Sequence, residues 1–262
     1  MNSMLASAAA VAMALVIAAC SRVPASPEGA AKKMLRAYGG SEKMARLGSF
    51  AGKGFIKDWS STVEARSFPF DVYRKGMLYK HKIMSAQRGT LTDVIVVYYD
   101  GTTSRAWVRG KGVRAVPAME LDLLKYRFPG VIQWVQGSDR RGEMLPVAKG
   151  EAVVRLRFRD GDDAVTLALD RKSWLLSSVE VSSSKDSSAV FLESYDHYTE
   201  VDGIPFPQEF KAGYGGDRPY EYILVSIELG ADLPDSLFRV TAADTMALAK
   251  PPAVEKQAAP KR

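Results

Sequence analysis

Alternation of apolar and polar side chains with a period of two runs through most of this chain. It occupies residues 49–116 and again residues 154–229, in short runs separated by turn signals such as Asp100-Gly101. Alternation of this kind buries one face of a strand, and short connections favour antiparallel neighbours. Because no linker divides residues 49–238, we predict a mainly β protein with a single antiparallel sheet of about eleven strands.

Two stretches break the alternation and are predicted to be helical. Ser26 can cap a helix with Pro27 at its first position, where the missing N–H costs nothing. In the middle of the chain, residues 118–127 have helix-like spacing, and residues 131–136 form a further short turn. We expect the central helix to cover one face of the sheet, either as a lid over a ligand or as a plain packing helix.

The only cysteine, Cys20, follows Val16-Ile17-Ala18-Ala19 at the end of an apolar run that begins at Met4. The run is shorter than the roughly 20 residues that span a bilayer. Small residues before a lone cysteine resemble a bacterial lipobox, which implies cleavage before Cys20 and a diacylglycerol on its thiol. Residues 1–19 are therefore predicted to be a lipoprotein signal peptide and residues 20–26 a tether. The alternative is a transmembrane anchor, and the absence of positive charge in residues 1–3 departs from the usual signal.

The net charge of +6 favours anionic partners such as a membrane surface. Export would exclude nucleic acid as a partner. Basic residues are concentrated only at the extreme C-terminus, where residues 241–262 are rich in Pro, Ala and Lys and are predicted to be a disordered tail.

Residues that carry catalytic or metal chemistry are sparse. The chain has two histidines, His81 and His197, and its aspartates at 160, 162 and 163 flank a glycine at a hairpin turn, where Asp is common for backbone reasons. No nucleophile elbow, zinc-protease or phosphate-loop motif occurs. We therefore predict no catalytic residue, no metal and no cofactor besides the lipid on Cys20. A hydrolase acting through Asp196 and His197 is the alternative.

The order of predicted elements, helix, six strands, helical insert and second strand set, resembles that of the LolA/LolB-like lipoprotein-sorting superfamily. Two short motifs strengthen the resemblance, the turn at residues 201–207 (Val-Asp-Gly-Ile-Pro-Phe-Pro) and the closure at residues 233–238 (Leu-Pro-Asp-Ser-Leu-Phe). The resemblance implies a domain over residues 27–240, an unclosed β-barrel that wraps an N-terminal helix and a central helical lid.

The resemblance also implies an apolar cavity that holds acyl chains, which need only apolar walls. A packed core without space for a ligand is the alternative. The candidate cavity residues are the large apolar side chains expected to point inward from the strands and from the lid. They are Phe68, Phe70, Tyr79, Trp107, Leu121, Leu124, Trp134, Leu156, Phe158, Leu167, Val225 and Ile227.

These expectations describe a lipid-anchored, non-enzymatic binding protein. Its expected partners are the membrane through the Cys20 lipid, the acyl chains of lipids or lipoproteins, and a periplasmic carrier or another envelope protein. Ser21 follows the cysteine, where Asp would favour the inner membrane, so we expect the outer membrane, facing the periplasm. The alternative is an envelope adaptor or stress sensor of the same fold that binds a protein.

Overall fold

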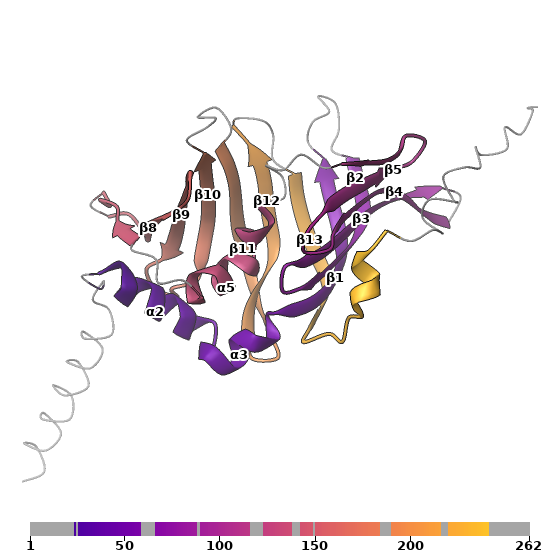
Figure 1. Ribbon diagram of the computed structural model, residues 1–262. Helices are drawn as coiled ribbons and strands as arrows, with labels where there is room; N and C mark the ends of the chain where they lie inside the picture. Colours follow the sequence, from indigo (N-terminus) through magenta and orange to yellow (C-terminus); the bar gives the residue numbers. More distant parts are fainter. Residues whose placement is uncertain are drawn as a thin grey trace, which may run out of the picture.

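The structure, a computed structural model, describes residue 24 and residues 26–58, 66–87, 90–115, 123–137, 142–148, 150–183, 190–215 and 220–240. These residues form a single antiparallel sheet of thirteen strands (Figure 1). The first set of strands is β1 Ser49–Asp58, β2 Arg66–Lys75, β3 Leu78–Gln87, β4 Thr90–Tyr99, β5 Ser104–Val108 and β6 Gly112–Ala115. The second set is β7 Gly142–Met144, β8 Val153–Asp160, β9 Asp163–Asp170, β10 Leu176–Ser183, β11 Val190–Val201, β12 Ile204–Tyr214 and β13 Tyr220–Leu229.

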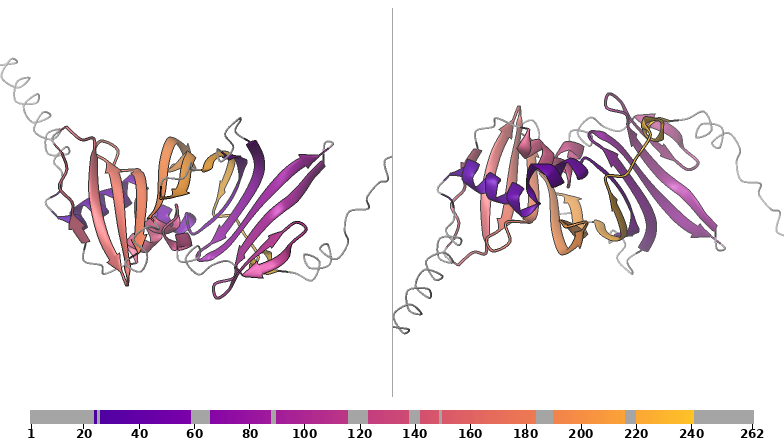
Figure 2. Two further views of the ribbon diagram at one scale, coloured as in Figure 1. Left: turned by 90° about the horizontal axis from the view of Figure 1, so that it is seen from above. Right: turned by 90° about the horizontal axis from the view of Figure 1, so that it is seen from below.

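The two sets are joined where the first strand pairs with the last. The order across the sheet is β6-β5-β4-β3-β2-β1-β13-β12-β11-β10-β9-β8-β7, so β6 and β7 form the two edges and the barrel is not closed. The sheet twists and bends, so that the two sets form wings that face the same central space (Figure 2). The predicted unclosed antiparallel barrel is confirmed.

Short helices cover the concave side of the sheet. Helix α2 (Pro27–Ala37) begins as predicted, with the Ser26 hydroxyl accepting a hydrogen bond from the Gly29 N–H at 3.1 Å. It is followed by α3 (Gly40–Arg46). The central insert has a single 3₁₀ turn, η1 (Leu123–Lys125), and the helix α5 (Gly130–Gln136). The predicted helix at 118–127 is therefore a single 3₁₀ turn where it is described, and residues 118–122 lie outside the described part.

The core lies between these helices and the concave face. Its buried side chains come from both wings and from all three α-helices, among them Met34, Tyr38, Ile132 and Leu156. A second, smaller cluster lies on the convex face, where the 3₁₀ turn η2 (Asp235–Phe238) packs against β3 (Figure 1). Every buried apolar residue of the described chain lies between residues 30 and 238, so a chain that starts at Ser21 contains the whole of this core.

Two details of the sheet differ from the prediction. Thirteen strands are present rather than about eleven, and one of the additional ones is β7, which is only three residues long. The pairing of β1 with β13 also contains a bulge. Lys53 pairs with Ser226 whereas Gly54 pairs with Leu224, so no residue of β1 is paired with Val225.

This bulge changes which side chains of β13 face the core. Tyr222 and Leu224 point to the concave face before it, and Leu229 does so after it. Val225 is 64% exposed, so its prediction as an inward residue is wrong. An uninterrupted period of two cannot reveal the extra residue, because a bulge shifts the alternation by one position.

Gly54 is the residue of β1 on which this bulge depends. A Cβ atom added there would overlap the carbonyl oxygen of Ile223. This oxygen belongs to the backbone of the paired strand, so it cannot move aside easily. We predict that Gly54→Ala lowers the free energy of unfolding by about 2–3 kcal/mol or more. Chemical denaturation measures this, with Lys53→Ala on the exposed side of the same strand as control; equal stability of the two variants would contradict the prediction.

Candidate functional site

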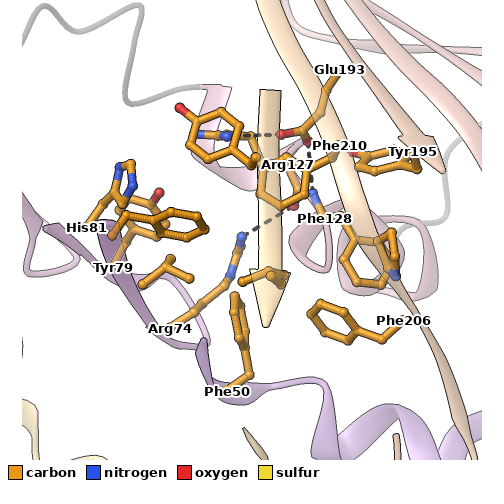
Figure 3. Close-up of a pocket in the computed structure, with 15 residues that line it drawn as sticks. Phe50, Arg74, Tyr79, His81, Arg127, Phe128, Glu193, Tyr195, Phe206 and Phe210 are labelled. Carbon is orange, nitrogen blue, oxygen red and sulfur yellow. Dashed lines mark hydrogen bonds and ion pairs between the residues drawn. The ribbon is translucent and has the colours of Figure 1, made fainter. Parts of the chain in front are cut away.

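A hollow lies where both wings of the sheet meet the segment that contains η1 and α5 (Figure 3). Its floor and sides come from strands of the two wings, and its roof is Arg127 and Phe128, between η1 and α5. The lining residues are mostly aromatic. They are Phe50, Phe70, Val72, Arg74, Tyr79, His81, Arg127, Phe128, Glu193, Tyr195, Phe206, Pro207, Phe210, Tyr222 and Leu224.

The aromatic rings of the hollow pack closely against one another. The Phe128 ring stands perpendicular to that of Phe206 at 4.9 Å between centroids and lies 5.7 Å from that of Tyr195. On the opposite side, Phe210 and Tyr222 stack in parallel at 4.6 Å. Such pairs add to the free energy gained from area burial, so the roof is held to the sheet partly by Phe128.

The free space inside is small. The centres of water-sized molecules can occupy about 30 Å³ of the hollow, which is room for a couple of waters. An acyl chain needs several times this space. The hollow therefore cannot hold a whole acyl chain while the η1–α5 segment lies in this position.

A buried carboxylate links the roof to β11. Glu193 is 1% exposed. Its Oε1 lies 3.0 Å from Arg127 Nε, and its Oε2 accepts hydrogen bonds from the Phe128 N–H at 3.3 Å and the Tyr195 hydroxyl at 2.6 Å. Burial would lower the pKa of Arg127, but the nearby Glu193 carboxylate outweighs it and raises that pKa above its usual value. The Arg127 guanidinium is thus charged.

A second arginine links the roof to the other wing. Arg74, on β2, is 3% exposed; its Nε donates to the Gly76 carbonyl at 2.9 Å and its Nη1 to the Arg127 carbonyl at 3.3 Å. Burial lowers the pKa of Arg74 to about 10, so the guanidinium is still charged at neutral pH. The backbone at Arg127 is therefore held from both wings.

Asp160 holds the other end of the η1–α5 segment. Its Oδ2 accepts hydrogen bonds from the Tyr126 hydroxyl at 2.8 Å and from Trp134 Nε1 at 3.2 Å, and it lies 2.8 Å from Lys125 Nζ. The predicted backbone role of this aspartate in its turn is incomplete, because the carboxylate of Asp160 also anchors the segment that covers the hollow.

His81 lies at the side of the hollow among aromatic rings. It is 7% exposed, and its ring is 5.4 Å from Phe70 and 5.9 Å from Tyr222. Its Nε2 atom is buried and has no hydrogen-bond partner. Burial, followed by the charge of Arg127, lowers the pKa of His81 to about 3. The imidazole is therefore neutral at physiological pH.

The structure separates the predicted cavity residues into several groups. Phe70 and Tyr79 line the hollow. Phe68, Trp134 and Ile227 are partly buried and pack against the main core, but they do not line the hollow. The strand residues farther along the second wing are fully packed core residues, and these are Leu156, Phe158 and Leu167.

Trp107 faces away from the hollow, as Val225 does. It pairs with Val96, whereas its neighbour Ala106 pairs with Val97 on the side that faces His81. The prediction that Trp107 points inward is wrong, because on this short strand the small Ala106 takes the concave position and the large ring takes the convex one. Leu121 and the side chain of Leu124 lie outside the described residues, as do Cys20, residues 1–19 and residues 241–262.

The alternative site at His197 lies on the surface. The His197 side chain is 63% exposed, and its Nδ1 is 3.0 Å from Glu209 and 3.8 Å from Asp196. Across the described ranges, no group of three or more metal-ligand side chains comes together. Within the same ranges, no helix is both long and apolar enough to cross a membrane.

The polar residues of the hollow were not among the sequence-based candidates. A signal for them was present, since Arg74 and Glu193 occupy inward positions in strands whose other inward side chains are apolar. A charged residue at such a position needs a buried partner. Arg127 could not be identified as that partner, because its position depends on how the central segment folds back across the sheet.

The buried pair gives a direct test of how the roof is held. Glu193→Gln keeps the shape of the side chain but leaves the buried Arg127 charge uncompensated, so we predict a loss of about 3–5 kcal/mol in the free energy of unfolding. The same acid-to-amide change at Asp202, which forms an exposed ion pair with Arg46, should change stability little. Chemical denaturation of both variants measures this, and equal losses would show that Glu193 does not hold the roof.

The fold of this chain also occurs in other proteins of known structure. No family model and no curated protein sequence matches the chain. Among solved structures, a LolA superfamily protein from Nitrosomonas europaea is similar over 80% of this chain and 97% of its own, with a TM-score of 0.54 and 13% identity. A DUF1329 family protein from Desulfovibrio piger is similar over 84% of this chain and 98% of its own, with a TM-score of 0.54 and 11% identity. The chain therefore has the same fold as these two proteins.

Proposed function

We propose that this chain is a lipid-anchored, non-enzymatic binding protein of the cell envelope. It holds the acyl chains of lipids or lipoproteins between the concave face and the η1–α5 segment, and it assists their localisation at the outer membrane. The observation that supports this is an aromatic hollow whose roof is attached to the two wings by a small number of polar contacts.

Binding of an acyl chain requires the roof to move, because the closed hollow is too small. Breaking the Arg127–Glu193 pair costs about 3–5 kcal/mol if one charge is left buried alone. Each buried CH₂ group contributes about 0.8 kcal/mol, so about ten of them contribute about 8 kcal/mol. Acyl binding can therefore offset the opening of the roof.

The proposed anchor is a lipid on Cys20. It would be joined to the folded domain through residues 20–26, since α2 begins at Pro27. A chain held to a membrane by so short a tether cannot cross the periplasm freely. The proposed role is thus that of a stationary receptor rather than of a soluble carrier.

A matched pair of substitutions tests acyl binding in the hollow. Val72→Phe adds bulk to its lining, whereas Val225→Phe makes the same change at an exposed position of the convex face. We predict that a chain of residues 21–262 purified from cells carries lipid detectable by mass spectrometry, that Val72→Phe reduces it severalfold, and that Val225→Phe leaves it unchanged. Equal lipid in the two variants, or none in the unsubstituted chain, would contradict the proposal.

The anchor is tested separately on the intact chain. We predict that Cys20→Ser abolishes incorporation of radioactive palmitate and releases the protein from the outer-membrane fraction, whereas Ser21→Ala changes neither. Retention of Cys20→Ser in the membrane would favour the transmembrane alternative.

A second candidate function is that of an adaptor that binds a protein. The observation that favours it is the set of exposed apolar side chains on the convex face, Phe55, Leu192 and Val225, which are 44%, 47% and 64% exposed. Purification of residues 21–262 with a stoichiometric protein and without lipid would support this candidate.

A further inference from the structure

We propose that the outward face of α2 and the adjoining β9–β10 turn form a surface that lies on an anionic phospholipid bilayer. The basic residues of this surface, which we call the basic face, are Lys32, Lys33, Arg36, Arg171 and Lys172. This inference rests on the proposed function, because it takes the lipid anchor at Cys20 and adds a second membrane contact to it.

Helix α2 carries its apolar and its basic residues on opposite sides. Ala30, Met34 and Tyr38 are buried in the core. Lys32 and Arg36 point the other way, because they lie half a turn from these positions, and both are exposed. Neither forms an ion pair with a residue of the described chain. The charges of this outward face are therefore available to a partner.

The chain that leads to the proposed anchor leaves the domain on this same face. A Cβ atom added to Gly29 would lie 2.9 Å from the Cβ of Pro24, so the tether packs against α2 at Gly29. Gly29 shares a helix face with Lys33 and Arg36, which follow it by four and seven positions. The tether and the basic side chains of α2 are thus on one side of the molecule.

The length of the tether keeps this face close to the bilayer. Four residue steps separate Pro24 from Cys20, and an extended chain spans at most about 3.6 Å per residue. Pro24 therefore lies no more than about 15 Å from the residue that would carry the lipid. The potential of a charged surface extends over about 8–10 Å at physiological ionic strength. Side chains beside Pro24 can thus enter the field of the membrane.

The β9–β10 turn extends the basic face next to α2. Lys33 Nζ lies over the Trp174 ring, 4.6 Å from its centroid, and this contact joins the helix to the turn. Arg171 and Lys172 are exposed there, and the Asp170 carboxylate fixes the turn by accepting a hydrogen bond from the Lys172 N–H at 3.0 Å. In the view from below, α2 lies in front of the strands of the second wing (Figure 2). The helix and the turn therefore belong to one end of that wing.

The basic face is positive overall. Its two elements carry five basic side chains and two carboxylates, Glu28 and Asp170, which leaves a net charge of +3. The neighbouring Arg46 does not change this balance, because it forms an ion pair with Asp202. Clusters of Lys and Arg are attracted to the anionic lipids of a bilayer surface. A bilayer is also the partner that the proposed anchor holds permanently beside this face.

The test measures binding of residues 21–262 to sedimented vesicles. This chain contains the whole described core and lacks Cys20, so no lipid of its own contributes. One set of vesicles contains phosphatidylglycerol and phosphatidylcholine, and the other contains phosphatidylcholine alone. Two triple variants are compared, and each loses three positive charges from exposed positions. The basic-face variant is Lys32→Gln, Arg36→Gln and Lys172→Gln, and the control variant, on the first wing, is Lys53→Gln, Arg105→Gln and Lys111→Gln.

We expect the unsubstituted chain to bind the anionic vesicles in preference to the neutral ones, and high salt to release it. The basic-face variant should bind about tenfold or more weakly, since each Lys or Arg near an anionic surface contributes about a fivefold factor. The control variant has the same net charge and should keep most of the affinity.

Equal losses in the two variants, or no preference for the anionic vesicles, would overturn the inference. Either result leaves the test of acyl binding with Val72→Phe unaffected. Retention of Cys20→Ser in the membrane would overturn the proposed anchor without changing the vesicle result, so the two failures are distinguishable.

Discussion

The arrangement of sheet and roof depends on the contacts of one buried side chain, the carboxylate of Glu193. A charge taken out of water is unfavourable unless it is paired and hydrogen-bonded, and Glu193 is satisfied by Arg127, the Phe128 N–H and the Tyr195 hydroxyl. Two of these three donors belong to the segment between η1 and α5. That segment must therefore cross the concave face at this point, and Arg74 then holds it from the other wing.

This arrangement explains why the hollow inside the open barrel is covered by the η1–α5 segment. The roof contributes one aromatic ring, Phe128, and covers the rest with backbone and charged groups that are tied to the sheet. The hydrogen bonds and ion pairs of the roof require a defined geometry. Burial of an apolar chain against the aromatic walls has no such requirement. The same structure can thus be well ordered without ligand and still accept a flexible apolar chain once the few ties are released.

The sequence predicts the regular parts of this molecule well and its exceptions poorly. Period-two alternation and the Ser26-Pro27 cap identify the strands and α2, because both depend on neighbouring residues. The bulge at Val225 and the outward Trp107 are decided by pairing with other strands. The site is harder still, since Arg74, Arg127, Asp160 and Glu193 gain their roles only when distant segments meet; of the predicted cavity residues, Phe70 and Tyr79 line the hollow.

In the proposed function, the roof moves to admit an acyl chain. Hydrogen–deuterium exchange of residues 21–262, with and without dodecanoate, measures this directly. We expect bound ligand to change exchange in residues 123–137 and in the parts of β2 and β11 that hold them, and to leave the convex segment at residues 231–240 unaffected. Unchanged exchange in residues 123–137 with bound ligand, or changes confined to the convex face, would contradict it.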